Sequence, residues 1–150
     1  MERTLIIAKP DAVQRGLVGE LIARFERRGL KIVGLKLMNV NTALAQEHYK
    51  EHTGKPFFGG LVSYITGCPV VIMVVQGPNA IEIARATIGA TNPVAAASGS
   101  IRGDLGVSIG RNLVHGSDGP QSAEREVALF FKSDELLDYE RSADRWIFES

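Results

Sequence analysis

The sequence of 150 residues lacks most features that would set it apart from ordinary globular proteins. Its single cysteine, Cys68, excludes an internal disulfide and fits a reducing compartment, and we expect it to serve in packing. The 17 basic and 17 acidic residues leave no net charge, which argues against nucleic acid as the main partner. No apolar run approaches the ~20 residues of a membrane span, and Lys9 ends the run Leu5–Ala8 too early for a signal peptide. We therefore expect a cytoplasmic protein with no membrane partner.

Two common ligand-binding patterns are also missing. The sequence has no G-x-x-x-x-G-K-[ST] segment, which excludes a P-loop enzyme, and the glycines between Gly103 and Gly110 miss the dinucleotide-binding spacing. His48 and His52 stand four residues apart and could share a metal ion on a helix. Because no cysteine or well-placed carboxylate completes such a site, we expect no metal held by the protein alone.

Hydrophobic periodicity predicts alternating strands and helices in one domain that spans residues 1–150. Strands are predicted at Leu5–Ala8, Leu30–Val40 and Val70–Val75, of which the last is the best candidate for a central strand. Helices are predicted from Leu17 to a stop at Gly29, from Thr42 towards His52, at Phe57–Ile65, from Asn79 to Ile88, and at Ser122–Phe131. Thr42 and Asn79 are the residue types that cap helix N-termini, so we predict that they do so here.

The segment from Thr91 to Gln121 is rich in glycine and has little periodicity. A loop of this length in a compact domain is usually either functional or disordered. The ordered composition on both sides and the absence of a charge run favour a functional loop.

His115 is the most informative residue of that loop. A neutral imidazole is a nucleophile near pH 7, because an unperturbed histidine titrates at roughly 6.5, and it can carry a group covalently. A lone histidine is more often a loop residue with its hydrogen bonds satisfied. If the fold brings Lys9, Arg85 and Arg102 close to His115, these cations would form the clamp that phosphoryl transfer requires.

The segment 112–118, with the sequence NLVHGSD, resembles the active-site motif of nucleoside diphosphate kinases. The resemblance covers essentially the whole chain and includes TLIIAKPDA at 4–12, HY at 48–49, KPFFGGLV at 55–62, TNP at 91–93 and IRGD at 101–104. It differs at 98–100, where SGS stands in place of the family's common PGT. Neither this replacement nor the other small departures from the family pattern falls on a residue that the family's chemistry uses.

The resemblance implies an α/β (α+β) fold of the ferredoxin-like βαββαβ type, with a four-stranded antiparallel sheet covered by helices. It implies transfer of the γ-phosphoryl group of a nucleoside triphosphate, such as ATP, to a nucleoside diphosphate through phospho-His115. Glu126 and Ser117 would orient His115, and the family attacks through the Nδ1 atom. The nucleotide would be held at its phosphates by Tyr49, Arg85, Thr91 and Arg102, at its ribose by Lys9 and Asn112, and at its base by Phe57, Ile109 and Leu61. Lys9 would also steady the transferring group.

The resemblance further implies Mg²⁺ carried by the nucleotide phosphates and a homo-oligomer, with a hexamer favoured over a tetramer. The segment 144–149 resembles the tail of hexameric members, although Trp146 could instead anchor an intramolecular core. The alternative functions are a catalytically silent nucleotide-binding module of the same fold and a nucleic-acid-binding protein. The presence of every expected catalytic residue argues against the first, and the zero net charge argues against the second.

Overall fold

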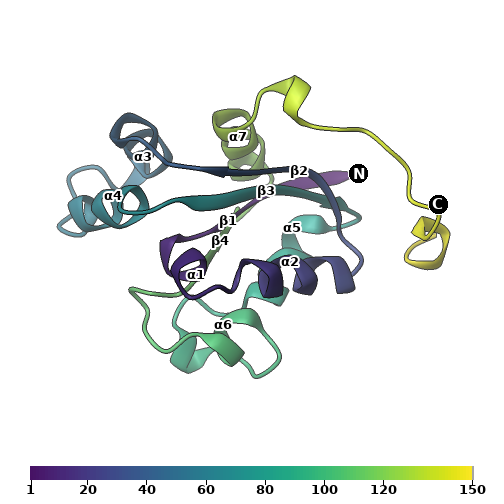
Figure 1. Ribbon diagram of the computed structural model, residues 1–150, viewed down its shortest axis with the longest axis horizontal. Coiled ribbons are helices and arrows are strands. Elements are labelled where there is room, and N and C mark those ends of the chain that lie inside the picture. Colours follow the sequence, from purple (N-terminus) through teal and green to yellow (C-terminus); the bar gives the residue numbers. More distant parts are fainter. Residues whose placement is uncertain (150) are drawn as a thin grey trace.

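The computed structural model describes residues 1–149 as a sheet with helices on both faces (Figure 1). The strands are β1 (Glu2–Ala8), β2 (Lys31–Met38), β3 (Val70–Gly77) and β4 (Val114–Gly116). The helices are α1 (Pro10–Gln14), α2 (Val18–Arg27), α3 (Thr42–His48), α4 (Phe58–Thr66), α5 (Ala80–Ile88), α6 (Ile101–Leu105) and α7 (Pro120–Phe130). The strands form a four-stranded antiparallel sheet in the order β2-β3-β1-β4. The predicted α+β fold is confirmed.

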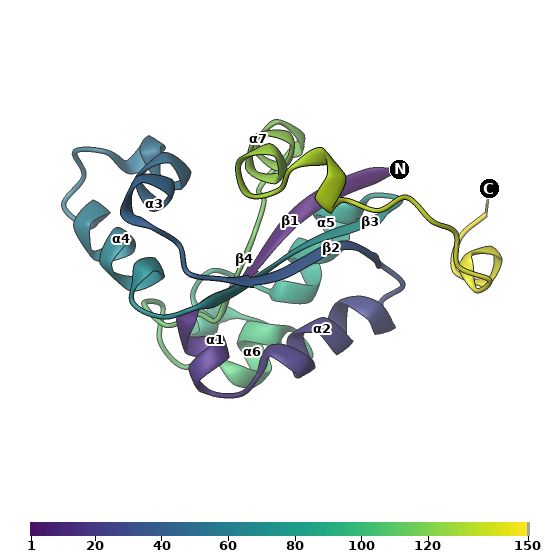
Figure 2. The ribbon, with the colours of Figure 1, turned by 45° about the horizontal axis from the view of Figure 1, so that its top comes forward.

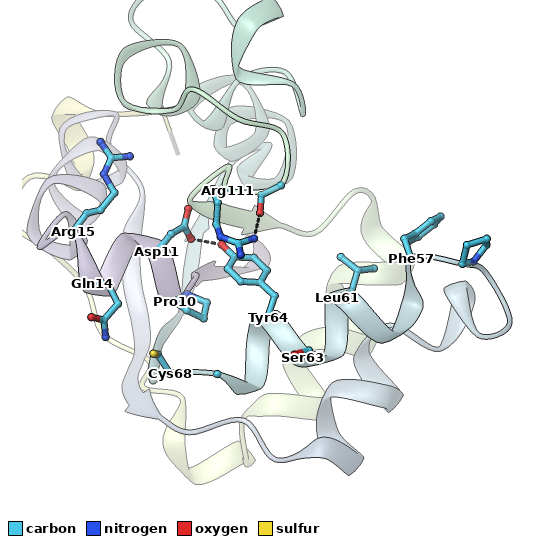
Figure 3. Close-up of a pocket in the computed structure, with 14 residues that line it drawn as sticks. Pro10, Asp11, Gln14, Arg15, Phe57, Leu61, Ser63, Tyr64, Cys68 and Arg111 are labelled. Atoms are coloured by element: carbon cyan, nitrogen blue, oxygen red, sulfur yellow. Dashed lines mark hydrogen bonds between the residues drawn. The ribbon is translucent and has the colours of Figure 1, made fainter.

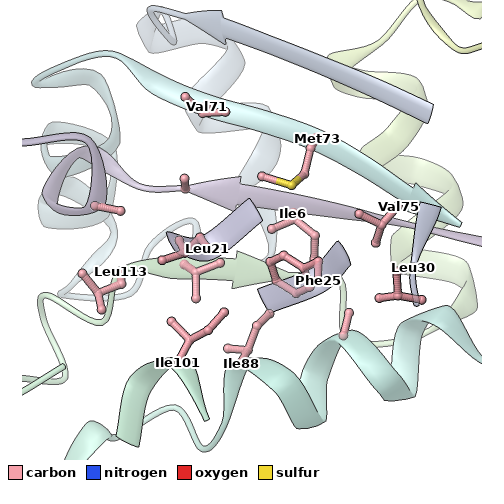
Figure 4. Close-up of a cluster of buried hydrophobic side chains, with 14 of the residues drawn as sticks. Ile6, Leu21, Phe25, Leu30, Val71, Met73, Val75, Ile88, Ile101 and Leu113 are labelled. Carbon is pink, nitrogen blue, oxygen red and sulfur yellow. The ribbon is translucent and has the colours of Figure 1, made fainter. Parts of the chain in front are cut away.

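The two faces of the sheet carry separate cores because successive side chains of a strand point to opposite sides. On one face Ile6 and Met73 pack against Phe25 of α2 and Ile88 of α5 (Figure 4). On the other face Leu5, Ile7 and Ile72 pack with residues of α3, α4 and α7. Figure 2 shows the two groups of helices on opposite sides of the sheet. Because β1 and β3 are buried on both faces, they read in the sequence as continuous apolar runs.

Strand β4 is short, and its pairing with β1 fixes the direction of the His115 side chain. Ile7 lies opposite His115, and Ala8 lies opposite Val114. Side chains directly opposite each other in an antiparallel pair share a face of the sheet. His115 therefore points to the face covered by α3 and α7, whereas Val114 joins the core under α2 and α5.

Most predicted elements are confirmed within one or two turns, but the predicted cap at Thr42 is wrong, and Asn79 holds the predicted N-cap position without a capping bond. The N-cap of α3 is Asn41, whose side chain accepts a hydrogen bond of 2.8 Å from the Leu44 amide, rather than Thr42. Asn79 adopts a left-handed conformation with φ of 54° and makes no capping hydrogen bond. The carboxylate of Glu2 accepts a bond of 2.8 Å from the Ile81 amide instead. This contact joins residues far apart in the chain, so local patterns do not reveal it.

The glycine-rich segment from Thr91 to Gln121 is built around α6 and β4. The strand near His115, which only the family resemblance predicted, is β4. At the other end of the chain, the tail beyond α7 first runs beside β2, where the Leu137 amide donates to the Val33 carbonyl at 2.9 Å, and then continues past the sheet (Figures 1 and 2). Trp146 is 79% exposed there, so its alternative role as a core anchor is wrong. Among residues 1–149 no helix is long and apolar enough to cross a membrane.

Candidate active site

His115 is held by a hydrogen-bonded group on β4 and α7. Its Nε2 atom lies 2.7 Å from Oε1 of Glu126, and the hydroxyl of Ser117 donates to the same oxygen at 2.8 Å. The Ser117 hydroxyl in turn accepts a bond of 3.3 Å from the backbone amide of Leu5 on β1. Glu126 and Ser117 are buried, whereas the His115 side chain keeps 23% of its surface exposed. The predicted catalytic residues His115, Glu126 and Ser117 are thus brought into direct contact.

The ionisation of Glu126 decides which nitrogen of His115 is free. Burial raises the pKa of the Glu126 carboxyl, but the hydrogen bonds and charge of His115 and the bond from Ser117 outweigh burial and keep the pKa below its usual value. An ionised carboxylate only accepts hydrogen bonds, so Nε2 of His115 carries a proton and donates it. A neutral imidazole protonated at Nε2 has its lone pair on Nδ1, which is then the ring nitrogen able to act as a nucleophile.

The backbone carbonyls around His115 bind two arginines. The Arg102 guanidinium donates to the carbonyls of Asn112 at 3.1 Å, Gly89 at 3.1 Å and Val114 at 2.6 Å. Arg85 on α5 donates to the Gly116 carbonyl at 3.3 Å. The helix can come this close because Gly116 has no side chain: an added Cβ would lie 2.7 Å from Cδ1 of Ile88.

These bonds leave donors on Arg102 for a ligand. A guanidinium has five N–H groups in total, and the three backbone bonds of Arg102 use three of them. Burial and the neighbouring Arg85 lower the pKa of Arg102 to about 10, so it stays charged at neutral pH. Arg85 and Arg102 thus both bond to the backbone of the strand that carries His115.

A third cation comes from the end of β1. The Lys9 ammonium donates to Oδ1 of Asn112 at 2.9 Å, and the Asn112 side-chain amide donates to the Thr91 carbonyl at 3.0 Å. Burial and the charge of Arg102 lower the pKa of Lys9 to about 8, against the opposing effect of Asp11. At neutral pH the Lys9 ammonium remains mostly protonated. Lys9, Asn112 and Thr91 thus form one connected group beside β4.

His48, the last residue of α3, and Tyr49, which follows it, lie next to His115 and Glu126. The sequence did not predict that His48 packs against His115. The His48 ring packs edge-on against the His115 ring, with centroids 4.9 Å apart and planes at 85°. Burial and nearby His115 lower the pKa of His48 to about 3, so it is neutral at physiological pH. Burial and the charge of Glu126 raise the pKa of Tyr49 to about 12, which keeps its hydroxyl protonated and able to donate. Within residues 1–149 no group of three or more His, Cys, Asp or Glu side chains could hold a metal ion.

The apolar residues predicted to hold a base lie apart from this polar group. Phe57 and Leu61 line a hollow of about 850 Å³ together with Gly110 and Arg111 (Figure 3), and neither His115 nor Arg102 lines it. Phe57 is 51% exposed and Ile109 is 58% exposed, so both present free apolar surface. Cys68 is half-buried at this hollow, so the expected packing role is met only in part. The open apolar hollow therefore lies apart from the cations, of which Arg102 is buried, Lys9 half-buried and Arg85 exposed.

A nucleophilic imidazole among cations can attack a phosphorus atom and stabilise the charge that develops on it. The fold and this group of residues define an α+β phosphotransferase domain. Comparisons with known proteins identify the family. The family model described as nucleoside diphosphate kinase matches residues 2–136.

Relatives match the chain over nearly its whole length. The nucleoside diphosphate kinase of Pelotomaculum thermopropionicum is 60% identical over 149 residues, which cover 99% of this chain and 100% of the relative. That of Chloroflexus aurantiacus is 62% identical over 151 residues, with 99% and 100% coverage. The solved structure of the Halobacterium salinarum nucleoside diphosphate kinase in complex with CDP superposes with a TM-score of 0.96 at 52% identity, covering 99% of both chains. The chain belongs to the nucleoside diphosphate kinase family, which confirms the predicted family and enzyme class.

The contact between Glu126 and His115 makes a prediction about stability and pH. Glu126→Gln removes a buried carboxylate whose pKa in the folded protein lies below the usual 4.5. The stabilisation it provides is complete above that value and is lost as the pH falls through the lower pKa of the folded state. We expect the variant to lower the free energy of unfolding at pH 7 by about 2 kcal/mol, as for a hydrogen bond to a charged group. The difference from wild type should shrink as the pH is lowered below 4.5.

The measurement is urea unfolding of both proteins from pH 7 into the acid range. The matched control is Glu124→Gln, which changes an exposed carboxylate on the same helix and should leave stability unchanged. A difference that stays constant with pH would mean that Glu126 is not ionised in the folded protein.

Proposed function

We propose that this chain transfers the γ-phosphoryl group of a nucleoside triphosphate, such as ATP, to a nucleoside diphosphate in two steps through His115. In the first step Nδ1 of His115 attacks the γ-phosphorus, the bond to the β-phosphate oxygen breaks, and the nucleoside diphosphate leaves. In the second step a terminal oxygen of another diphosphate attacks phospho-His115, and the P–N bond breaks. The observation that carries this proposal is the bond between Nε2 of His115 and Glu126, which leaves Nδ1 as the nucleophile.

The cations stabilise the transferring group because charge spreads over its oxygens in the transition state. Arg85 and Arg102 bind the phosphates with the N–H groups that their backbone contacts leave free, aided by Tyr49 and Thr91. Mg²⁺ bound to the nucleotide phosphates would supply further positive charge there, with Arg85 and Arg102 as the protein's own cations at the phosphates. The ammonium of Lys9 donates to Asn112, the proposed ribose partner, and we assign it also to steadying the transferring group.

The base stacks on Phe57 and meets Ile109 and Leu61 at the open apolar end of the site. Stacking rewards any aromatic face and so discriminates weakly between bases. The hollow beside Phe57 is open, and none of the polar side chains that line it is buried. A wrong base would therefore leave no buried hydrogen-bonding group unpaired. All common nucleoside diphosphates are therefore substrates of this site.

The second half of the edge strand β2 supports the proposed homo-oligomer, whereas the tail covers the first half, where Leu137 bonds to Val33. Strand β2 lies at the edge of the sheet, with Leu35 at 50% and Leu37 at 66% exposed. An uncovered apolar edge strand is a template for pairing with a second chain. We favour a hexamer over a tetramer, as the resemblance of the tail at 144–149 implies. We also propose one domain across residues 1–150 and a cytoplasmic location, which the lone cysteine supports.

The first prediction of this proposal is a phosphoenzyme. Incubation with γ-labelled ATP should label the protein in a form that is stable to base and labile to acid, as a phosphoramidate is. His115→Ala should remain folded and take up no label, whereas the control His52→Ala should be labelled like wild type. An unlabelled wild-type protein would favour the catalytically silent module, and full exchange activity in His115→Ala would rule out the covalent route.

The second prediction concerns the base. The specificity constants for adenine, guanine, cytosine, uracil and thymine diphosphates should differ only modestly, with purines favoured by their larger stacking area. Phe57→Ala should lower all of them, and those of purines most, by roughly 10- to 100-fold for the loss of one stacking platform. The control Leu137→Ala truncates an exposed apolar side chain on the tail and should change none. A preference for one base by several orders of magnitude would require a base-reading residue.

The third prediction concerns assembly. Light scattering should give the mass of a hexamer. Leu37→Lys should shift it to smaller species, because a charge on the apolar edge strand opposes pairing. Gln46→Lys adds the same charge to an exposed position of α3 and should leave the mass unchanged. A monomeric wild-type protein would contradict the proposed oligomer.

A further inference from the structure

Leu113 adopts a backbone conformation that its side chain disfavours. Its φ is 74°, in the left-handed region, where a bulky residue is uncommon. It lies between Asn112 and β4, so it links the backbone of Asn112 to the strand that carries His115. A conformation of this kind persists only where the surrounding contacts fix it.

Three contacts fix Leu113. Its side chain is fully buried in the core under the sheet (Figure 4), and its carbonyl accepts a bond of 2.9 Å from the Lys9 amide. Its own amide donates to Oδ2 of Asp11 at 3.0 Å. Asp11 is therefore the only side chain among residues 1–149 that holds the Leu113 backbone by a hydrogen bond.

The second oxygen of Asp11 reaches a different part of the site. Oδ1 accepts a hydrogen bond from the hydroxyl of Tyr64 on α4, the helix that also carries Leu61 (Figure 3). The Tyr64 ring is covered by the Arg111 guanidinium, 4.6 Å from its centroid. One carboxylate thus joins the end of β1, the helix at the apolar end and the loop that leads into β4.

We propose that Asp11 is a positioning residue that presets the ribose-binding group of Lys9 and Asn112 against the helix that carries the base platform. This inference rests on the proposed function, because it takes Lys9 and Asn112 to meet the ribose hydroxyls. Asp11 lines the hollow beside Phe57, but both of its carboxylate oxygens are bonded to the protein, so its proposed role is to position other groups rather than to bind substrate. Its contribution is to hold Leu113, and through it Asn112, in the geometry that a nucleotide needs before it binds, so that no ordering cost is left for the binding step.

The conservative variant separates hydrogen bonding from charge. In Asp11→Asn the amide oxygen can still accept from the Leu113 amide, and the new NH₂ group can donate to the Tyr64 hydroxyl oxygen. In Asp11→Ala both bonds are lost. If Asp11 acts by positioning, Asp11→Asn should therefore recover most of the preference for ATP over the dideoxynucleotide that Asp11→Ala loses. A purely electrostatic effect of the Asp11 charge on Lys9 would be lost in both variants.

The experiment compares specificity constants for ATP and for 2′,3′-dideoxy-ATP, which lacks the ribose hydroxyls. Asp11→Ala should lower the constant for ATP by about tenfold, as expected for one lost hydrogen-bonded contact, and should change the constant for the dideoxynucleotide far less. The ratio between the two substrates should therefore shrink by about tenfold. Asp11→Asn should restore the ratio, and the control Asp138→Ala, at an exposed carboxylate of the tail, should keep it.

Tyr64→Phe removes only one of the two contacts and should shrink the ratio in the same direction by less, which tests the proposal if Asp11→Ala does not fold. An equal loss on both substrates, or an Asn variant no better than the Ala variant, would overturn the positioning role. Failure of the proposed function looks different: the wild-type protein would then form no phosphoenzyme with ATP, before any variant is compared.

Discussion

The backbone pairing that sets Ile7 opposite His115 is the constraint on which the rest of the site depends. A shift of one residue would turn the imidazole to the face of α2 and α5, away from Glu126 and His48. Two contacts specify this register strongly. Val114 packs into the core under α2 and α5, and the Ser117 hydroxyl accepts a hydrogen bond from the backbone amide of Leu5 on β1. The register between β1 and β4 thus sets both the packing of the sheet and the direction of the His115 side chain.

The short strand that carries His115 is secured by the cations that also prepare the site for phosphate. Arg102 and Arg85 bond to the carbonyls of Val114 and Gly116, on either side of the histidine. Burying a guanidinium is costly unless its N–H groups find acceptors, and the backbone of the strand supplies them. The same residues thus support β4 and carry the charges assigned to phosphate binding in the proposed mechanism.

A strained backbone and the contacts that support it also occur together beside Lys9 and Asn112. Leu113 holds an unfavourable φ, and Asp11, Lys9 and the core fix it there. A site assembled in this way before the ligand arrives binds it without reordering its own residues. The arginines are held in place by hydrogen bonds to the backbone of β4. The loop at Leu113 is held by the packing of its side chain and by the carboxylate of Asp11.

The sequence by itself determined the buried strands, the amphipathic helices and, through the family motif at 112–118, the candidate residues of the site. Apolar runs and 3.6-residue spacing are local, so β1, β3 and α2 could be predicted from them. The motif also named His115, but no pattern in its neighbourhood revealed β4, because three residues are too few for a period.

Only the tertiary structure decided which distant groups meet. It placed Glu2 rather than Asn79 at the start of α5, His48 against the ring of His115, and Asp11 between Leu113 and Tyr64. These contacts join residues that are far apart in the chain, and their geometry follows from the strand register and helix packing rather than from neighbouring residue types. The free nitrogen of His115 was decided in the same way, because it depends on a carboxylate that α7 brings to β4.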